Sequence, residues 1–349
     1  MAKTIETYEG MPVIEANDSK ALEKKLEKMD GIKPPFAVKI SSRTKMIKEN
    51  AFSRCTDIAA ILIPDSVTEI GYQAFSGCTG LTSVCIPDSV TEIGNYAFED
   101  CTGLTSIEIP DSVKEIGSGT FAGCTGLIAI CVSEANPAYH SSGNCLIHTE
   151  SHTLIIGCNH SVIPSSVTEI GSSAFSGCTR LTSVCIPDSV TEIGRSAFSG
   201  CTGLTSINIP DSVTEIGSGA FAGCTGLTSI EIPDSVKEIG SGAFSGCKGL
   251  TAINIPNSVT VIESYTFANC ERLTSVDIPD SVTKIDSEAF VYCTELTSVN
   301  IPDSVTYIGD EAFFGCKLTS VNIPDSVKYI GWQAILDCPG KPQKRKIYK

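Results

Sequence analysis

Several features that mark membrane proteins and enzymes are absent from this sequence. No apolar run approaches the roughly 18 residues that a membrane span requires, so we expect no membrane insertion. The chain has no G-x-S-x-G elbow and no P-loop, and no Cys/His pair lies in a recognisable catalytic motif. We therefore predict a protein that is not an enzyme and carries no cofactor.

Basic residues are scarce over most of the chain. The net charge is −15, from 25 Lys and Arg against 40 Asp and Glu. Residues 1–50 hold ten basic and eight acidic residues, and residues 339–349 hold five basic and no acidic ones, which leaves 10 basic against 32 acidic in between. Such an acidic body repels phosphate backbones, so nucleic acid is not an expected partner.

The N-terminus offers no secretory signal, because Met1–Thr7 lacks an apolar core. On this basis we predict a cytoplasmic protein. The 17 cysteines are better explained as small buried hydrophobes and free thiols than as a disulfide framework. Twelve of them share one position in a repeat: Cys55, Cys78, Cys101, Cys124, Cys178, Cys201, Cys224, Cys247, Cys270, Cys293, Cys316 and Cys338.

What the chain does have is a repeat with a period of 23 residues. The prolines show the period: Pro64, Pro87, Pro110, Pro164, Pro187, Pro210, Pro233, Pro256, Pro279, Pro302 and Pro324. A fixed period of this length indicates a solenoid. From residue 58 we count twelve coils; the coil at 127–157 is eight residues longer and the coil at 296–317 is one shorter. Regular repetition also argues against an active site, which needs unlike residues at one point.

One coil, 204–226, shows the expected local structure. Ile207 and Ile209 alternate as in a short strand with one buried face, which Pro210 ends. A second short extended segment is expected at Thr214–Ile216. The spacing of Ala220, Phe221 and Cys224 fits a single helical or 3₁₀ turn on the opposite side.

The sequence outside the repeat predicts two terminal segments. Residues 1–34 should form an N-terminal cap with a short helix over 20–30, because terminal repeats must shield an apolar end. The solenoid is expected over 35–340, with a hairpin in the longer coil 127–157. Residues 341–349 form a basic tail.

The repeat unit resembles the BspA-type, or Treponema pallidum-type, leucine-rich repeat. In one coil the residues that carry the match are Leu227, Ile230, Ile232, Pro233, Val236, Ile239, Gly240, Ala243, Phe244 and Cys247. The resemblance implies a right-handed leucine-rich solenoid with a strand-lined concave face. It also implies a binding scaffold, often a surface protein that adheres to host matrix or other cells, and so favours a secreted or cell-surface location.

The first candidate binding surface is the outward-facing strand position between the two buried residues. We call it the strand row: Cys85, Glu108, Cys131, Cys185, Asn208, Glu231, Asn254, Asp277, Asn300 and Asn322. Its Glu108, Glu231, Asn254, Asp277, Asn300 and Asn322 would suit a protein or glycan partner. The alternative is a merely solvated strand face.

Aromatic residues at the coil corners form a second candidate. They are Tyr72, Tyr96, Tyr265, Tyr292, Tyr307, Phe314, Tyr329 and Trp332. Those from Tyr292 onward lie in the last three coils, where Tyr307 and Trp332 are candidate partner contacts. Trp332 has an alternative role as a plug for the last coil.

The longer coil and its surroundings contain all four histidines: His140, His148, His152 and His160. Imidazole suits zinc or copper, but the spacing is not that of a zinc finger. The alternative is a β-hairpin that pairs 145–148 with 153–156. The aspartates that follow the prolines, such as Asp188 and Asp211, are expected to cap turns rather than bind calcium.

These observations favour a non-enzymatic, monomeric scaffold that binds a macromolecular partner through the solenoid surface. The alternatives are a cell-surface adhesin or carbohydrate-binding protein, and a metal-binding module at the four histidines.

Overall fold

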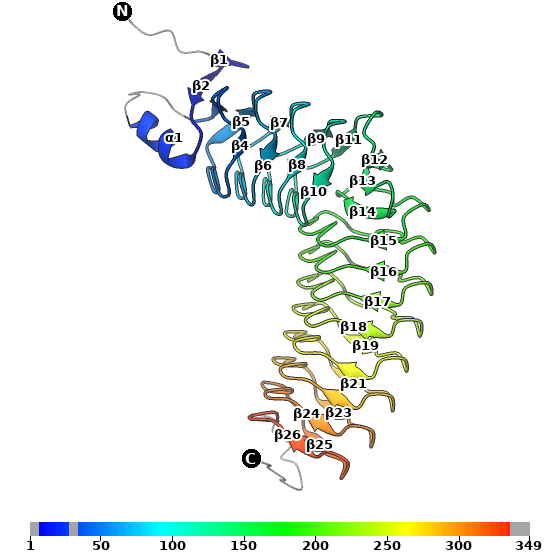
Figure 1. Cartoon of the computed structure of the whole chain (residues 1–349). Coiled ribbons are helices and arrows are strands. Elements are labelled where there is room, and N and C mark those ends of the chain that lie inside the picture. Colours follow the sequence, from blue (N-terminus) through cyan, green and yellow to red (C-terminus); the bar gives the residue numbers. More distant parts are fainter. Residues whose placement is uncertain (1–6, 28–33, 336–349) are drawn as a thin grey trace, which may run out of the picture. The chain divides into compact units, whose positions relative to one another are not determined.

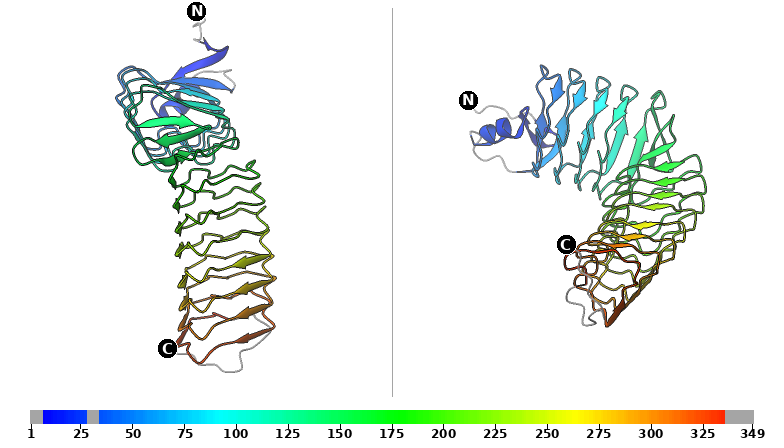
Figure 2. Two further views of the ribbon diagram at one scale, coloured as in Figure 1. Left: turned by 90° about the vertical axis from the view of Figure 1, so that its right-hand side faces the viewer. Right: turned by 60° about the horizontal axis from the view of Figure 1, so that its bottom comes forward.

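The computed structural model describes residues 7–27 and 34–335 and shows stacked coils (Figures 1 and 2). The chain divides into two compact units, Met1–Val162 (unit 1) and Ile163–Lys349 (unit 2). The predicted tail 341–349, Cys338 and parts of the predicted cap lie outside the described residues. Among the described residues, no helix has both the length and the apolar character that crossing a membrane requires.

A regular coil contributes up to one strand to each of two parallel rows. The strand that precedes the proline belongs to the first sheet, and the Glu-Ile strand that follows the turn belongs to the second sheet. Partners lie 23 residues apart, as in Glu192 with Glu215 and Ile193 with Ile216. The predicted solenoid of short parallel strands is therefore confirmed.

Unit 1 begins with a short antiparallel pair and one helix. Helix α1 (Ser19–Leu26) starts at Asp18, whose carboxylate accepts from the Ala21 N–H at 2.7 Å, and it buries Leu22 against the first coils. The first-sheet strands are β1 (Thr7–Tyr8), β2 (Met11–Glu15), β3 (Phe36–Lys39), β5 (Ile58–Leu62) and β7 (Ser83–Cys85), then β9 (Ser106–Ile109) and β11 (Ala129–Val132). The second-sheet strands are β4 (Met46–Ile47), β6 (Glu69–Ile70), β8 (Glu92–Ile93) and β10 (Glu115–Ile116).

The longer coil at the end of unit 1 contains the expected hairpin. Its strands are β12 (Tyr139–Ser142), β13 (Cys145–His148) and β14 (Thr153–Ile156), and they pair antiparallel. Asn136 stands 23 residues after Val113, at a position that is valine in regular coils. Its amide donates to the carbonyls of Pro110 and Val113 and accepts from the N–H groups of Ala138 and Tyr139. One buried polar side chain thus replaces the apolar repeat residue.

Unit 2 has a regular second sheet and an interrupted first sheet. The second-sheet strands are β15 (Glu169–Ile170), β16 (Glu192–Ile193), β17 (Glu215–Ile216) and β18 (Glu238–Ile239), then β20 (Val261–Ile262), β22 (Lys284–Ile285), β24 (Tyr307–Ile308) and β26 (Tyr329–Ile330). The first-sheet strands are β19 (Ala252–Asn254), β21 (Ser275–Asp277), β23 (Ser298–Asn300) and β25 (Ser320–Asn322). Before β19, the first sheet of unit 2 shows the isolated bridges Cys185–Asn208 and Asn208–Glu231.

The segment predicted as one helical turn is a chain of tight turns. Ala197, Ser199 and Cys201 donate their N–H groups to carbonyls three residues earlier. The residues between them donate instead to the next coil, as Phe198 does to Ala220 at 2.7 Å. Ser196 and Gly200 have positive φ, which re-aims alternate N–H groups along the stack. The expected three-residue hydrogen bonds are present, but each is followed by a bond between coils.

A column of phenylalanines forms the centre of each unit. Phe52, Phe75, Phe98 and Phe121 stack in unit 1 with ring centroids 5.2 to 5.6 Å apart. In unit 2 the stack runs through Phe175, Phe198, Phe221, Phe244, Phe267, Phe290 and Phe313. The longer coil has no phenylalanine, so the column stops in the coil where unit 1 ends.

Candidate functional site: the strand row

All ten residues of the strand row are exposed. The reason is the pleat of a strand, in which neighbouring side chains point to opposite faces. Ile207 and Ile209 are buried and Asn208 between them faces solvent. The candidate partner residues Glu108, Glu231, Asn254, Asp277, Asn300 and Asn322 therefore share one face within their own unit.

The strand row is hollowed in both units. In unit 1 a hollow of about 510 Å³ is lined by Ser83, Cys85, Asp88, Ser106, Glu108, Asp111 and Cys131, among others. In unit 2 a hollow of about 470 Å³ is lined by Ser183, Cys185, Ser206, Asn208, Ser229 and Glu231 with three apolar neighbours. A hollow of about 400 Å³ shares Asn208 and Glu231 with it and adds Asp211, Asp234 and Asn254.

The side chains that line these three hollows are carboxylates, hydroxyls, amides, thiols and apolar groups, and none is Lys or Arg. Such a lining accepts hydrogen bonds and attracts positive charge. The hollows give the strand row a shape that a flat solvated face would lack. The alternation of residues along each strand predicts the strand row, but nothing in the sequence predicts the hollows.

Of the C-terminal aromatic residues, Tyr307 and Tyr329 lie on the second sheet, in β24 and β26. The rings of Tyr307 and Tyr329 stack with centroids 4.6 Å apart, and the Lys284 ammonium lies 5.2 Å from the Tyr307 centroid. Both faces of the Tyr307 ring are thus occupied by neighbours. Trp332 is 65% exposed, so the described residues do not enclose it. The backbone N–H of Trp332 donates to the Asp310 carboxylate at 2.7 Å.

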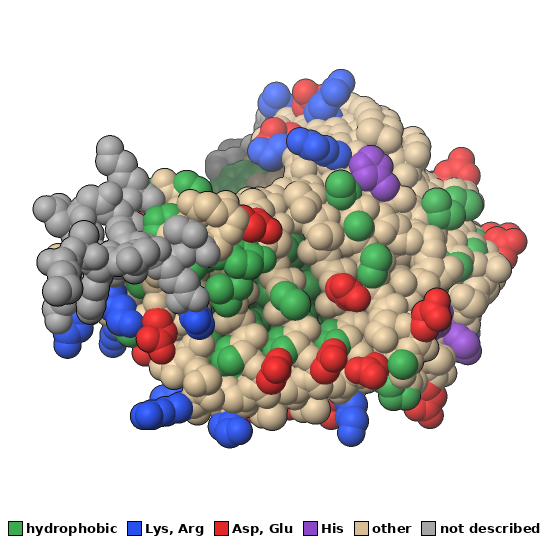
Figure 3. All heavy atoms as spheres, turned by 90° about the horizontal axis from the view of Figure 1, so that it is seen from above, with side chains coloured by type: hydrophobic (Ala, Val, Ile, Leu, Met, Phe, Trp, Pro, Cys, Tyr) green, Lys and Arg blue, Asp and Glu red, His purple; other side chains and the backbone are tan. Residues whose placement is uncertain are grey.

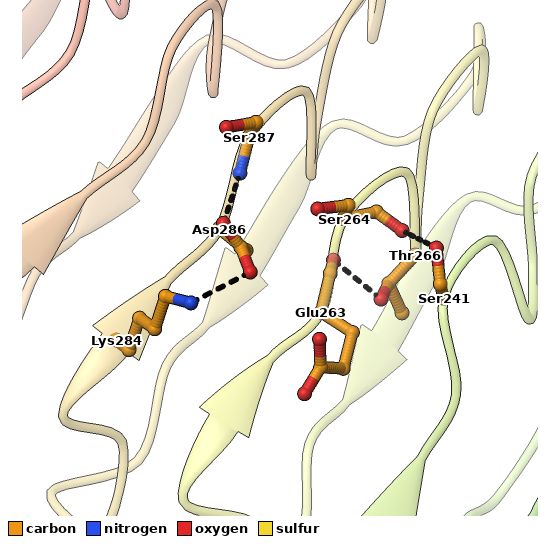
Figure 4. A network of polar contacts seen from close by, with 7 residues as sticks. All are labelled: Ser241, Glu263, Ser264, Thr266, Lys284, Asp286 and Ser287. Carbon is orange, nitrogen blue, oxygen red and sulfur yellow. Dashed lines mark hydrogen bonds and ion pairs between the residues drawn. The ribbon is translucent and has the colours of Figure 1, made fainter.

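Charged groups accompany this stack. Lys284 donates to Asp286 at 2.8 Å, and the Ser287 N–H donates to the same carboxylate (Figure 4). Desolvation opposes the ionisation of Asp286, but these two donors hold its pKa below the usual value. Negative charge on Asp310 raises the pKa of Tyr329. The patch therefore combines aromatic edges with charges of both signs.

Two of the four histidines make separate local side-chain contacts. His140 Nδ1 lies 3.1 Å from Thr149 Oγ1, and His148 Nδ1 lies 2.9 Å from Ser151 Oγ. His148 also packs edge-on against Tyr139, with ring centroids 5.4 Å apart. His152 and His160 are exposed. In the space-filling view the visible histidines are separated by other side chains (Figure 3).

Across residues 7–27 and 34–335 no three His, Cys, Asp or Glu side chains gather into a group that could hold a metal. The structure thus does not bring the predicted metal ligands together. The hairpin interpretation accounts for the same residues through the pairing of β13 with β14.

The aspartates after the prolines are exposed, and in several coils the serine that follows bonds to the backbone. Ser189 Oγ donates to the Val167 carbonyl and Ser212 Oγ to the Val190 carbonyl, each at 2.6 Å. These bonds join successive coils. The serines therefore link coils instead of capping local turns, and aspartates such as Asp88, Asp111, Asp211 and Asp234 line the hollows.

The cysteine column is buried and bonded. Cys224 Sγ donates to the Phe198 carbonyl at 3.1 Å, and Cys247 Sγ donates to the Phe221 carbonyl at 3.2 Å. Burial raises the pKa of the Cys224 thiol to about 12. These thiols pack between coils and are unsuited to chemistry at the surface.

Comparison with known proteins agrees with this architecture. The model of the BspA type leucine-rich repeat region matches residues 45–160, 146–236 and 214–340. None of the curated proteins matches the sequence.

Solved bacterial structures share the fold. A leucine-rich repeat protein from Eubacterium ventriosum is 26% identical with a TM-score of 0.71, over 89% of each chain. A leucine rich cell surface protein from Faecalibacterium prausnitzii is 28% identical with a TM-score of 0.54, over 87% of this chain and 86% of that one. The pneumococcal vaccine antigen PcpA, at 21% identity and a TM-score of 0.59, covers 81% of this chain and 76% of its own, and shows the fold alone. The repeat, the paired sheets and these matches together place the chain in the BspA-type leucine-rich repeat family.

Proposed function

We propose that this protein is a non-enzymatic scaffold that binds a protein partner through the strand row. The observation that carries the proposal is the set of acidic, hydroxyl-lined hollows that the row forms in each unit. Membership of a repeat family whose domains generally bind proteins supports it. A row of exposed carboxylates and amides one coil apart suits an extended segment that offers cations and N–H donors.

A second candidate is a cell-surface adhesin. The likeness to a leucine rich cell surface protein supports that location. Tyr307 itself is unsuited to stacking on a sugar ring, because Tyr329 stacks on it and the Lys284 ammonium lies over it, whereas Tyr329 and Trp332 are exposed. We place the partner on the strand row, whose hollows carry the proposal, and propose that it is a protein.

The test is capture of proteins from a soluble extract and from an extracellular-matrix preparation by the immobilised full-length chain. The double variant Glu231→Lys with Asp277→Lys should lose about tenfold of the specifically captured protein. The matched control, Glu192→Lys with Glu215→Lys, makes the same charge change on the second sheet of the same unit and should retain capture. Equal capture by both variants and the wild type would exclude the strand row.

A further inference from the structure

Three cysteines differ from all others in the described part of the chain. Of the sixteen cysteines there, Cys85, Cys131 and Cys185 are exposed, and the rest are buried or half-buried. All three occupy the strand row. No described residue hydrogen-bonds to any of their three sulfur atoms, whereas column thiols such as Cys224 donate to a carbonyl of the preceding coil. The strand row therefore holds every fully exposed thiol in residues 7–27 and 34–335, and Cys55 of the cysteine column is half-buried.

Two of these thiols share the unit 1 hollow. Cys131 is the register partner of Glu108 in the parallel ladder, and Cys85 lies one further coil away. Two coil steps of about 4.8 Å separate Cys85 from Cys131 by about 10 Å. A disulfide needs Cα atoms about 4.4 to 6.8 Å apart. The two thiols are therefore too far apart to form a disulfide with each other. A disulfide at Cys85 or Cys131 in this hollow needs a sulfur atom from another molecule.

The charge of the hollow selects among external sulfur groups. Glu108 lies between the two thiols, and Asp88 and Asp111 line the same hollow. A second copy of this hollow would bring like charges face to face, which opposes self-association through it. An anionic disulfide is repelled for the same reason. A positively charged disulfide is attracted before it reacts.

We propose that Cys85 and Cys131 form a covalent docking site for a cationic, disulfide-bearing partner. The proposal rests on the proposed function, because it uses the same strand row. A thiolate Sγ of Cys85 or Cys131 attacks one sulfur of the partner disulfide. The new S–S bond forms as the old one breaks, and the departing sulfur leaves as a thiolate that takes up the proton the cysteine lost. One disulfide is exchanged for another, so no oxidant is consumed.

Three small disulfides of similar length and different charge test the proposal on the native full-length chain. Cystamine is cationic, bis(2-hydroxyethyl) disulfide is neutral and 3,3′-dithiodipropionate is anionic. Intact-mass and peptide-mass measurements follow adducts at Cys85 and Cys131 with time. Cystamine should react about tenfold faster than the neutral disulfide, and the anionic one more slowly, because a charged cleft concentrates counter-ions. The differences in rate among the three disulfides should disappear in 1 M salt, where the electrostatic screening length falls to about 3 Å.

Variants separate the charge effect from folding. Glu108→Gln should reduce the cystamine preference and leave the rate with the neutral disulfide unchanged, which also shows that the variant is folded. Cys85→Ser with Cys131→Ser should remove the unit 1 adducts and keep the one at Cys185. Cys185, whose hollow is lined by the single carboxylate Glu231, should show a weaker preference. Equal rates for all three disulfides at Cys85 and Cys131, or first reaction at the column thiols, would overturn the proposal.

One further measurement separates this proposal from the proposed function. Partner capture in dithiothreitol that still depends on Glu231 and Asp277, together with equal disulfide rates, overturns the thiol site alone. A clear cystamine preference with no loss of capture in the Glu231→Lys, Asp277→Lys variant supports the thiol site and overturns the proposed protein binding through the strand row.

Discussion

A regular coil and the longer coil 127–157 solve the same packing problem with different chemistry. In the regular coil 181–203 the interior is apolar, with Val190 and Phe198 fully buried, and Ser189 bonds to the preceding coil. In the longer coil Asn136 stands at the valine position. Its amide reaches the Val113 carbonyl, the kind of acceptor that serine uses in a regular coil. The buried Tyr139 adds a bond from the Ile116 N–H to its hydroxyl at 3.0 Å.

The difference shows that the repeat fixes the backbone acceptors more strictly than it fixes the side chains. Each coil must satisfy the carbonyls of the one before it. A regular coil does so with serine, threonine and cysteine around an apolar centre. The longer coil does so with one asparagine, and its Tyr139 hydroxyl accepts from the Ile116 N–H of the coil before it.

The largest expected effect is in the regular coil. Phe198→Ala should lower the free energy of unfolding by about 3–5 kcal/mol, because a fully buried ring is replaced by a cavity. The ring also stacks on both Phe175 and Phe221. Urea unfolding followed by circular dichroism measures the change, and the exposed Thr202→Ala is the control. A loss below 1 kcal/mol would mean that the phenylalanine column does not hold the coils together.

A smaller effect is expected when the longer coil is given the regular residue. Asn136→Val should destabilise the protein by about 1–3 kcal/mol, although valine is the residue at this position in regular coils. The variant leaves carbonyls of Pro110 and Val113 and two N–H groups without their partner. The same urea titration measures it. A neutral or stabilising result would show that packing, and not these hydrogen bonds, defines the longer coil.

The smallest effect concerns the glutamates that the repeat places next to one another in successive strands of the second sheet. Desolvation, together with the charges of Glu169 and Glu215, raises the pKa of Glu192. Because the folded state favours the protonated carboxyl, wild-type stability falls as the pH rises through that pKa and is regained below it. Glu192→Gln should therefore stabilise the protein by about 0.2–1 kcal/mol at pH 7, and the gain should shrink at pH 4.

The control for this variant is Glu231→Gln on the strand row, where Asn208 and Asn254 stand one coil away on either side. It should change stability less at pH 7. An equal gain in stability from both variants would show that the neighbouring Glu169 and Glu215 do not destabilise the folded protein through Glu192.

Much of this protein follows from its sequence because the pattern is local and repeated. The alternation of Ile207 and Ile209 predicts the exposure of Asn208, and the same reasoning places all of the strand row on the surface. The hairpin was predicted from two short apolar segments, 145–148 and 153–156, on either side of a short turn, and these segments pair in the structure. The helix predicted over 20–30 is found at Ser19–Leu26.

The candidate site was only partly predictable. The row was visible, but the hollows depend on how Glu108, Asp111 and Cys131 stand beside one another across coils. The four histidines lie close in sequence, yet His140 and His148 contact local hydroxyls, and no metal-binding group of three His, Cys, Asp or Glu forms among the described residues. Tyr307 was predicted as a partner contact, and only the structure shows that its ring stacks on Tyr329.

The sequence by itself determined the period, the inward and outward side of each strand, and the family. These depend on the order of apolar and polar residues, which is written along the chain. The tertiary structure alone decided which acceptor each side chain reaches, because those bonds join residues 22 to 26 positions apart, as in Ser189 with Val167 and Cys224 with Phe198. It also decided that Cys85 and Cys131 share a hollow while column thiols such as Cys224 are buried between coils, because both arrangements result from the stacking of one coil on the next.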